Sequence, residues 1–341
     1  MRRLPTGVSF PQTLLEVSNQ FDARIRAGNL AGYKPIPTGF HPLDEVLGGG
    51  LHAGALTLIA GQQGVGKTIF VVQAARNIAA GGLATACVVC FEHSPNYLYH
   101  RILCMESIDP RAHHPQGVTM EDIRRAVIES AEEGSFSSLY AILKKLPKAR
   151  EGWERLVTYW ERLLIAKGHP FKTTLAVLDT YLEQLREQHE VVVLFVDYFQ
   201  KMPLFGQPDV PDEKKIAIVT EGLKNLAQAY EVPIVAVSAL DAEGLKAEKP
   251  GVQDLWGGPT IKYEPDVAIL LRPTGRAQVT FSVGKNRMGP QYVEFEHRLH
   301  GPYYCFNPQG STVRATFKEL EENARAQEEF HEQREARHHD R

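Results

Sequence analysis

The stretch that most constrains how this chain folds is GQQGVGKT at residues 61–68. It meets the pattern G-x-x-x-x-G-K-[ST] with Gly61, Gly66, Lys67 and Thr68. Glycines let the backbone turn so that several N–H groups point at phosphate oxygens, and a helix that starts near Lys67 adds its positive dipole end. The motif therefore predicts a phosphate-binding loop. Its expected residues are Gly61, Gln62, Gln63, Gly64, Val65, Gly66, Lys67 and Thr68.

The flanking sequence supplies the context that this motif requires. ALTLIAG at residues 55–61 is a short apolar strand that leads into the loop, and TIFVVQAARNIAA at 68–80 has the pattern of a helix. In this arrangement Lys67 would reach the β- and γ-phosphates, and the Thr68 hydroxyl would hold Mg²⁺. We therefore expect ATP and Mg²⁺ as ligands.

The rest of the chain alternates between strand candidates and helix candidates. Strands are expected at 55–60, 84–91, 191–197, 232–238, 266–272, 278–284 and 291–298. Helices are expected at 68–80, 95–106, 120–132, 151–166, 173–188 and 213–230. This alternation predicts an α/β fold with a mostly parallel, twisted sheet and helices on both faces.

Three parts are expected along the chain. An N-terminal helix with a connector occupies residues 1–35, a nucleotide-binding domain occupies 36–310, and a strongly charged tail occupies 311–341. Inside the second part, residues 107–190 show no convincing strand pattern and are expected to form a mostly helical insertion on one side of the sheet.

The N-terminal helix is expected at residues 13–28, where Thr13 and Glu16 form a capping box. Apolar residues recur along one side of this helix. They are Leu14, Val17, Phe21 and Ile25. Because a lone amphipathic helix must lay such a stripe on another surface, we expect a docking partner for it.

Composition limits the remaining possibilities. A net charge of −3 is not typical of a protein built mainly to coat nucleic acid. No apolar run approaches the roughly 18 residues of a membrane span, and MRRLPTGVSF lacks the apolar core of a signal peptide. Four cysteines among 341 residues fit a reducing setting. We expect a cytoplasmic protein without a membrane segment.

Two carboxylates follow expected buried strands, at the strand ends where ligands gather in open α/β sheets. Asp197 ends VVVLFVD, from where it can reach the Mg²⁺ shell. Glu92 follows CVVCF, from where it can polarise the water that attacks a γ-phosphate. A third strand ends in SVGKNRMGP, whose tip carries Lys285 and Arg287. A protruding tip of this kind can reach the nucleotide of a neighbouring subunit.

Four segments together resemble the C-terminal ATPase domain of DnaB-type replicative helicases, which has a RecA-like fold. They are residues 36–68, FEHS at 91–94, VDYFQ at 196–200 and GKNRMGP at 284–290. The resemblance implies that Lys67 and Thr68 bind phosphate and Mg²⁺, that Glu92 is the catalytic base and that Asp197 completes the metal site. It also implies that Gln200 lies near the γ-phosphate.

The same resemblance implies a homo-oligomeric ring, a hexamer, that translocates on single-stranded DNA by hydrolysing ATP. In such a ring Lys285 and Arg287 act on the nucleotide of the neighbouring subunit. The helix at 13–28 resembles the linker helix that docks on the adjacent subunit, which would account for its apolar stripe.

One alternative stays open, a RecA- or KaiC-like regulatory or assembly ATPase with a client protein in place of DNA. Ala239 favours it, since the resemblance places a phosphate-sensing glutamine there. Residues 241–266, expected to face the ring channel, hold three lysines against six carboxylates, a net charge of −3. An acidic segment is poorly suited to gripping phosphates.

Overall fold

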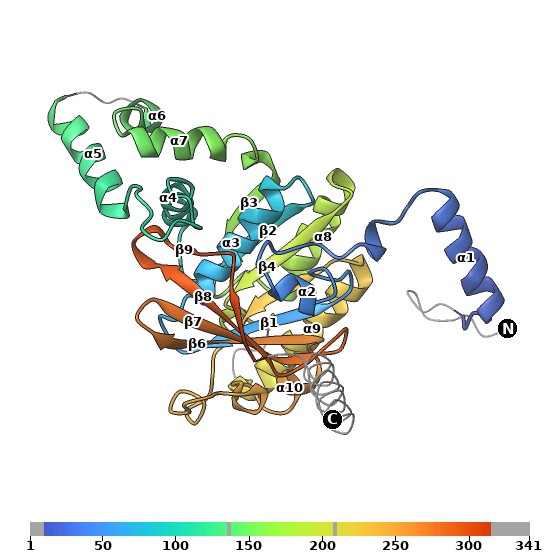
Figure 1. The fold of residues 1–341 in the computed structure, drawn as a ribbon. Helices are drawn as coiled ribbons and strands as arrows, with labels where there is room; N and C mark the ends of the chain where they lie inside the picture. Colours follow the sequence, from blue (N-terminus) through green and yellow to red (C-terminus); the bar gives the residue numbers. More distant parts are fainter. Residues whose placement is uncertain (1–9, 135–137, 207–209, 315–341) are drawn as a thin grey trace, which may run out of the picture.

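The computed structural model describes residues 10–134, 138–206 and 210–314. In this part of the chain, ten strands form one sheet in the order β10-β8-β7-β6-β1-β5-β4-β2-β3, with β9 paired to β8 (Figure 1). Pairing is parallel from β6 across to β3 and antiparallel from β6 to β10. The expected α/β fold with a mostly parallel sheet is confirmed.

The strands have the following bounds: β1 (Leu56–Gly61), β2 (Thr85–Cys90), β3 (Leu163–Lys167), β4 (Val192–Asp197), β5 (Ile234–Val237), β6 (Val267–Gly275), β7 (Gln278–Asn286), β8 (Val293–His300), β9 (Cys305–Phe306) and β10 (Ser311–Arg314). The α-helices are α1 (Leu14–Arg26), α2 (Leu43–Val46), α3 (Lys67–Ala80), α4 (Pro95–Glu106), α5 (Met120–Glu132), α6 (Leu139–Leu143), α7 (Pro147–Leu156), α8 (Leu175–Gln188), α9 (Asp212–Tyr230) and α10 (Thr260–Tyr263). Short 3₁₀ turns are η1 (Ala31–Tyr33), η2 (Trp160–Arg162), η3 (Phe199–Lys201), η4 (Val252–Asp254) and η5 (Gly301–Tyr303).

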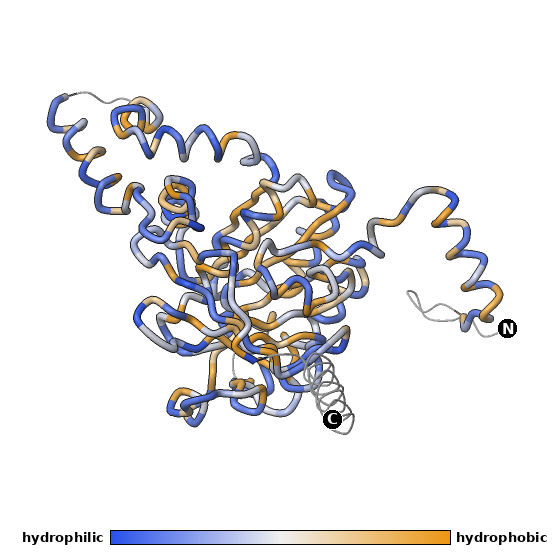
Figure 2. Tube along the Cα trace, viewed as in Figure 1, coloured by the Kyte–Doolittle hydropathy of each residue, from blue (hydrophilic) through white to orange (hydrophobic). Residues whose placement is uncertain are grey.

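Helices cover both faces of the sheet, as the sequence predicts. Side chains alternate along each strand, so in β4 Phe195 joins the core under α3 and α4 while Leu194 joins the core under α8 and α9. The central strands are buried along their whole length. They form the most hydrophobic part of the molecule (Figure 2). This double burial holds the carboxyl ends of the strands at fixed positions for the site described below.

The expectation of no strand within residues 107–190 is wrong. Residues 163–167 form β3, which pairs with β2 in parallel at the edge of the sheet, and α7 ends at Leu156 rather than near residue 166. The run LLIAK is short and apolar, and such a run is compatible with either a helix or a strand. Pairing with the buried strand β2 decides in favour of the strand.

At the other edge, β10 pairs with β8, so the sheet continues four residues past position 310. Most of the expected charged tail, residues 315–341, lies outside the described residues. Among those that are described, no helix is long and apolar enough to cross a membrane.

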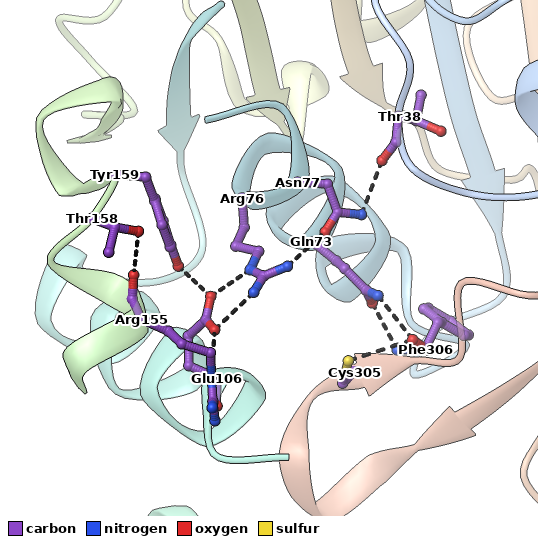
Figure 3. Close-up of polar contacts among 10 residues, drawn as sticks. All are labelled: Thr38, Gln73, Arg76, Asn77, Glu106, Arg155, Thr158, Tyr159, Cys305 and Phe306. Carbon is purple, nitrogen blue, oxygen red and sulfur yellow. Dashed lines mark hydrogen bonds and ion pairs between the residues drawn. The ribbon is translucent and has the colours of Figure 1, made fainter. Parts of the chain in front are cut away.

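A buried carboxylate attaches the helical insertion to the nucleotide-binding core (Figure 3). Glu106, at the end of α4, is 1% exposed and forms an ion pair with Arg76 of α3. It also accepts a hydrogen bond from Tyr159 Oη at 2.6 Å and forms an ion pair with Arg155 of α7 at 3.5 Å. One side chain therefore links α3, α4 and α7.

The N-terminal helix α1 projects from the body of the molecule (Figure 1). Its start is fixed by the expected capping box, in which Thr13 and Glu16 exchange hydrogen bonds. Every residue from Leu14 to Arg26 is exposed, including the whole apolar stripe. Its contacts with the rest of the chain include an exposed ion pair between Arg24 and Glu231 at 3.2 Å. Phe21 of the stripe also contacts the ring of Tyr33, with 5.1 Å between the ring centroids, but every residue of the stripe keeps exposed surface for a second surface to cover.

Candidate nucleotide-binding site

The phosphate loop lies between β1 and α3, as the sequence predicts. Strand β1 ends at Gly61, and Gly66 is the N-terminal cap of α3 with φ +105°. Gly64 has φ +79°. Both values belong to the left-handed region that side chains disfavour, so the motif glycines are needed for the turn. Val65 is buried and anchors the loop, while Gln63 is exposed and Gln62 half-buried.

Lys67 lies across the loop that precedes it. Its Nζ donates to the carbonyl oxygens of Gly61 and Gln62, both at 2.8 Å. Burial lowers the pKa of Lys67, and the nearby carboxylates of Asp197 and Glu92 oppose that shift. The lysine is therefore held at the mouth of the loop, where its charge faces two carboxylates.

Asp197 ends β4 beside the loop and is 1% exposed. Burial raises its pKa, and a hydrogen bond with the Thr68 hydroxyl lowers it. Oδ2 accepts from Cys90 Sγ at 3.7 Å, whereas Oδ1 has no hydrogen-bond partner among the residues described. A buried carboxylate oxygen without a partner, next to a threonine hydroxyl, is a fitting pair of donors for Mg²⁺.

Glu92 lies on the same side of the sheet, two residues after the end of β2. In the parallel register Cys90 is paired with Asp197, so the two acidic residues follow adjacent strand ends. Glu92 is exposed. Together with Lys67, Thr68 and Asp197 it lines a cavity of about 800 Å³. Four further candidate residues of the phosphate loop line the same cavity, namely Gly61, Gln63, Gly64 and Gly66, so the structure brings eight of the candidate site residues together.

Gln200 lies just behind this cavity, in η3, and is buried. Its Nε2 donates to Ser238 Oγ at 2.9 Å, while Oε1 has no partner in the described part of the chain. Ser238 lines the cavity, and so does Ala239 beside it. Gln200 is therefore connected to the cavity wall through Ser238.

Arg101 is a basic residue that lines the cavity but was not predicted from the sequence. The guanidinium of Arg101 on α4 lies between the rings of Tyr97 and Tyr304, with its Cζ 4.5 Å from each ring centroid. Its Nε is buried without a partner among the described residues. Arg101 comes nine residues after Glu92, which places it on the first helix after the second strand. That position was its only signal.

Lys285 and Arg287 lie elsewhere, at the end of β7 and just beyond it, and neither is among the described residues that line the cavity. Lys285 Nζ donates to the carbonyl of Tyr263 at 2.6 Å, and Arg287 Nη2 donates to the same oxygen at 2.7 Å. Burial and the neighbouring Arg287 lower the pKa of Lys285. The structure keeps the two cations together and apart from their own nucleotide cavity.

The residues around the cavity fit a magnesium–nucleotide complex. The loop offers backbone N–H groups at a helix N-terminus together with Lys67, which suits phosphates. Thr68 and the unpartnered Asp197 oxygen suit a divalent cation.

Comparisons with known proteins agree with this geometry. The model of the DnaB-like helicase C terminal domain matches residues 35–300. The replicative DNA helicase DnaB of Treponema pallidum (strain Nichols) is 25% identical over 292 residues, which cover 85% of this chain and 59% of that protein. DnaB of Geobacillus stearothermophilus is 23% identical over 249 residues, which cover 72% of this chain and 48% of that protein. The chain thus spans about half the length of these relatives.

Solved structures show the same fold. One of them, an isolated ATPase domain, superposes with a TM-score of 0.67 at 16% identity, covering 87% of this chain and 99% of that one. A DnaB-like replicative helicase, solved in a study of its interactions with primase, gives a TM-score of 0.66 at 16% identity, covering 87% and 67%. The expected RecA-like ATPase fold is confirmed. Since the family model covers most of the chain, this protein belongs to the DnaB-like helicase C-terminal domain family.

Proposed function

We propose that this chain is an ATP-hydrolysing motor that assembles into a hexameric ring and translocates on single-stranded DNA as a DNA helicase. The observation that carries the proposal is the separation of two sets of residues. The phosphate loop, Glu92 and Asp197 share one cavity, while Lys285 and Arg287 are held outside it. A site divided in this way is completed by a second copy of the chain. The relatives named above are replicative DNA helicases.

Within one protomer, each residue has a distinct task. The loop N–H groups and Lys67 hold the phosphates and stabilise the charge that builds up on them. Thr68 and Asp197 would hold Mg²⁺, which would supply positive charge next to the phosphate oxygens. Glu92 accepts a proton from the attacking water, and its exposed position leaves room for that water. Gln200 lies near the γ-phosphate, behind the cavity wall, and senses it through its hydrogen bond to Ser238, which lines the cavity.

Between protomers, Arg287 and Lys285 stabilise the phosphoryl charge on the neighbour's nucleotide. The apolar stripe of α1 docks on an adjacent protomer and loses its contact with water there. Both features support assembly in which each copy contributes to its neighbour.

The charge of residues 241–266 is less adverse to DNA than the sequence count indicates. Asp266 is buried and forms an ion pair with Lys224, whereas the half-buried Asp241 and Asp254 accept from Gly244 N and Gly251 N of their own loop. The remaining carboxylates are matched one for one by lysines. They are Glu243, Glu248 and Glu264 against Lys246, Lys249 and Lys262. With Asp266 neutralised inside the protein, the exposed charge of this segment is less negative than −3, so the sequence count weighs less against DNA.

The test is the ATPase rate of the purified chain with and without single-stranded DNA, over a range of salt concentrations. We expect stimulation of several-fold that weakens steeply as salt rises, because phosphate contacts release counterions. Lys67→Ala serves as the inactive control, and displacement of one strand from a forked duplex reports unwinding. A rate that is indifferent to DNA would overturn the proposal and favour the regulatory ATPase, for which Ala239 remains the supporting observation.

A further inference from the structure

The carboxylate of Asp266 is a meeting point of three elements. Asp266 lies just before β6 and is 7% exposed. Its Oδ2 accepts from the backbone N–H of Leu56 at 2.8 Å and from Lys224 Nζ of α9 at 2.7 Å. Its Oδ1 accepts from Arg287 Nη1 at 3.2 Å. One buried carboxylate therefore holds the first residue of β1, a buried ammonium and the proposed trans-acting arginine.

Arg287 is held at its backbone and at both terminal nitrogens of its guanidinium, yet its side chain is half-exposed. Its backbone N–H donates to the carbonyl of Asp266 at 2.9 Å, and its Nη2 donates to the carbonyl of Tyr263 at 2.7 Å. The side chain nevertheless remains 50% exposed. A guanidinium has five N–H donors, so donors remain for a ligand that approaches from outside.

We propose that Asp266 is a positioning residue for Arg287, which fixes the guanidinium at one place on the protomer surface before a neighbour docks. This proposal rests on the proposed function, in which Arg287 acts on the neighbour's nucleotide. A free arginine side chain has many rotamers, and ordering it during the reaction lowers the rate. An arginine already held by two oxygen acceptors avoids that ordering step.

A purely structural role for Asp266 makes a different prediction. Asp266 also fixes the start of β1, and the far end of that strand carries the phosphate loop. If Asp266 only supported β1, its loss would damage the nucleotide cavity of its own protomer. If it positions Arg287, its loss damages catalysis at the neighbour's cavity.

The variant must avoid a buried lysine without a partner, which alone can prevent folding. We therefore combine Asp266→Asn with Lys224→Met, because methionine preserves the volume and removes the charge. The matched control is Lys224→Met alone, which retains the contact between Asp266 and Arg287. We expect the double variant to show a kcat about 10²-fold below that of the control, the scale of a misplaced catalytic group, with little change in KM for ATP.

Mixed rings then locate the defect. Each double-variant protomer has an intact phosphate loop, and each Lys67→Ala protomer has an intact, correctly held Arg287. We expect their mixture to recover hydrolysis that neither shows alone. The reference is a mixture of Arg287→Ala with Lys67→Ala, which tests the trans action itself.

The possible outcomes separate the two proposals. If the reference mixture recovers but the double-variant mixture does not, Asp266 serves its own phosphate loop and the inference is wrong. If the reference stays inactive while native gels show mixed rings, the trans role of Arg287 fails and this inference fails with it. A double variant that keeps the kcat of its control would also overturn the inference.

Discussion

A Cβ atom added to Gly66 would lie 2.7 Å from Cζ of Phe306, so the ring of Phe306 is packed directly against the backbone of the phosphate loop. Phe306 is itself fixed by Gln73 of α3, whose side-chain amide exchanges two hydrogen bonds with the Phe306 backbone, at 2.8 and 2.7 Å. Strand β9, which contains Phe306, thus packs against the phosphate loop at Gly66 and supports it.

Gly66→Ala is expected to abolish nucleotide binding, because it combines a positive φ with this collision. Gly64→Ala is the matched comparison, since φ is also positive but no atom lies within 4 Å of the added Cβ. It should weaken binding far less, by the cost of the backbone conformation alone, about 1 kcal/mol. Fluorescent-nucleotide titration measures both, and equal losses would show that packing against Phe306 is unimportant.

Glu92→Gln is expected to retain nucleotide binding while slowing hydrolysis by about 10²-fold or more, as for a lost general base. The amide keeps the shape of the side chain but cannot accept a proton from water. Lys67→Ala should also abolish hydrolysis, through loss of the charge that stabilises the phosphates. Single-turnover hydrolysis and nucleotide titration separate the steps. If Glu92→Gln loses binding in proportion to rate, Glu92 is a structural residue.

Removal of residues 1–30 is expected to leave a folded but largely unassembled chain. All of α1 is exposed in the protomer, so folding loses little, whereas association loses the area that the stripe would bury. Phe21→Ser should weaken assembly in the same direction, and Asn19→Ser, off the stripe, should not. Multi-angle light scattering reports the mass, and an intact ring after the deletion would contradict docking by α1.

Glu106→Gln is expected to lower the free energy of unfolding by about 3 kcal/mol, since it leaves the Arg76 guanidinium without its buried counter-charge. Glu151→Gln is the control, because the pair between Glu151 and Lys148 is exposed and should contribute nothing measurable. Urea denaturation followed by circular dichroism compares the two. Equal midpoints would mean that the insertion does not depend on the Glu106 network.

His297 is expected to make the fold sensitive to acid. Burial of its ring, whose centroid lies 4.4 Å from that of Phe281, lowers the pKa of His297 to about 4. The unfolded chain therefore takes up a proton near pH 6.5, before the folded chain does, and stability falls as the pH drops from 6.5 towards 4. His297→Gln should flatten that decline, as measured by denaturant midpoints across this range. Parallel curves for the two proteins would exclude His297 as the cause.

Much of the site could be predicted from the sequence because its determinants are local. The phosphate loop needs glycines, a lysine and a threonine at fixed spacing, and these residues lie where expected. Asp197 and Glu92 could be predicted as site residues because each lies at or just after the end of a buried strand, and parallel strands end on the same side of a sheet. Their roles in catalysis remain predictions.

Other features depend on contacts between distant residues. The strand at 163–167 forms because β2 offers it an unpaired edge, and no pattern within LLIAK distinguishes it from a helix. The charge count of residues 241–266 could not reveal that Asp266 is bound by Lys224 and Arg287, which lie 42 and 21 residues away along the chain. No pattern in the sequence shows that Arg101 lies between the rings of Tyr97 and Tyr304.

The exposure of α1 separates two properties that are usually linked, the stability of one copy and the association of copies with one another. Residues that bind another copy often pack against the core of their own domain as well. A mutation that alters how copies associate therefore often alters stability too. Here the residues from Leu14 to Arg26 contribute to the protomer only exposed surface, an exposed ion pair and the ring contact of Phe21 with Tyr33 among the contacts described. In the proposed ring, substitutions along this helix would therefore strengthen or weaken association while the nucleotide-binding core stays equally stable. If rings form as proposed, this helix is the part of the chain at which evolution or an engineer can set the concentration at which they assemble.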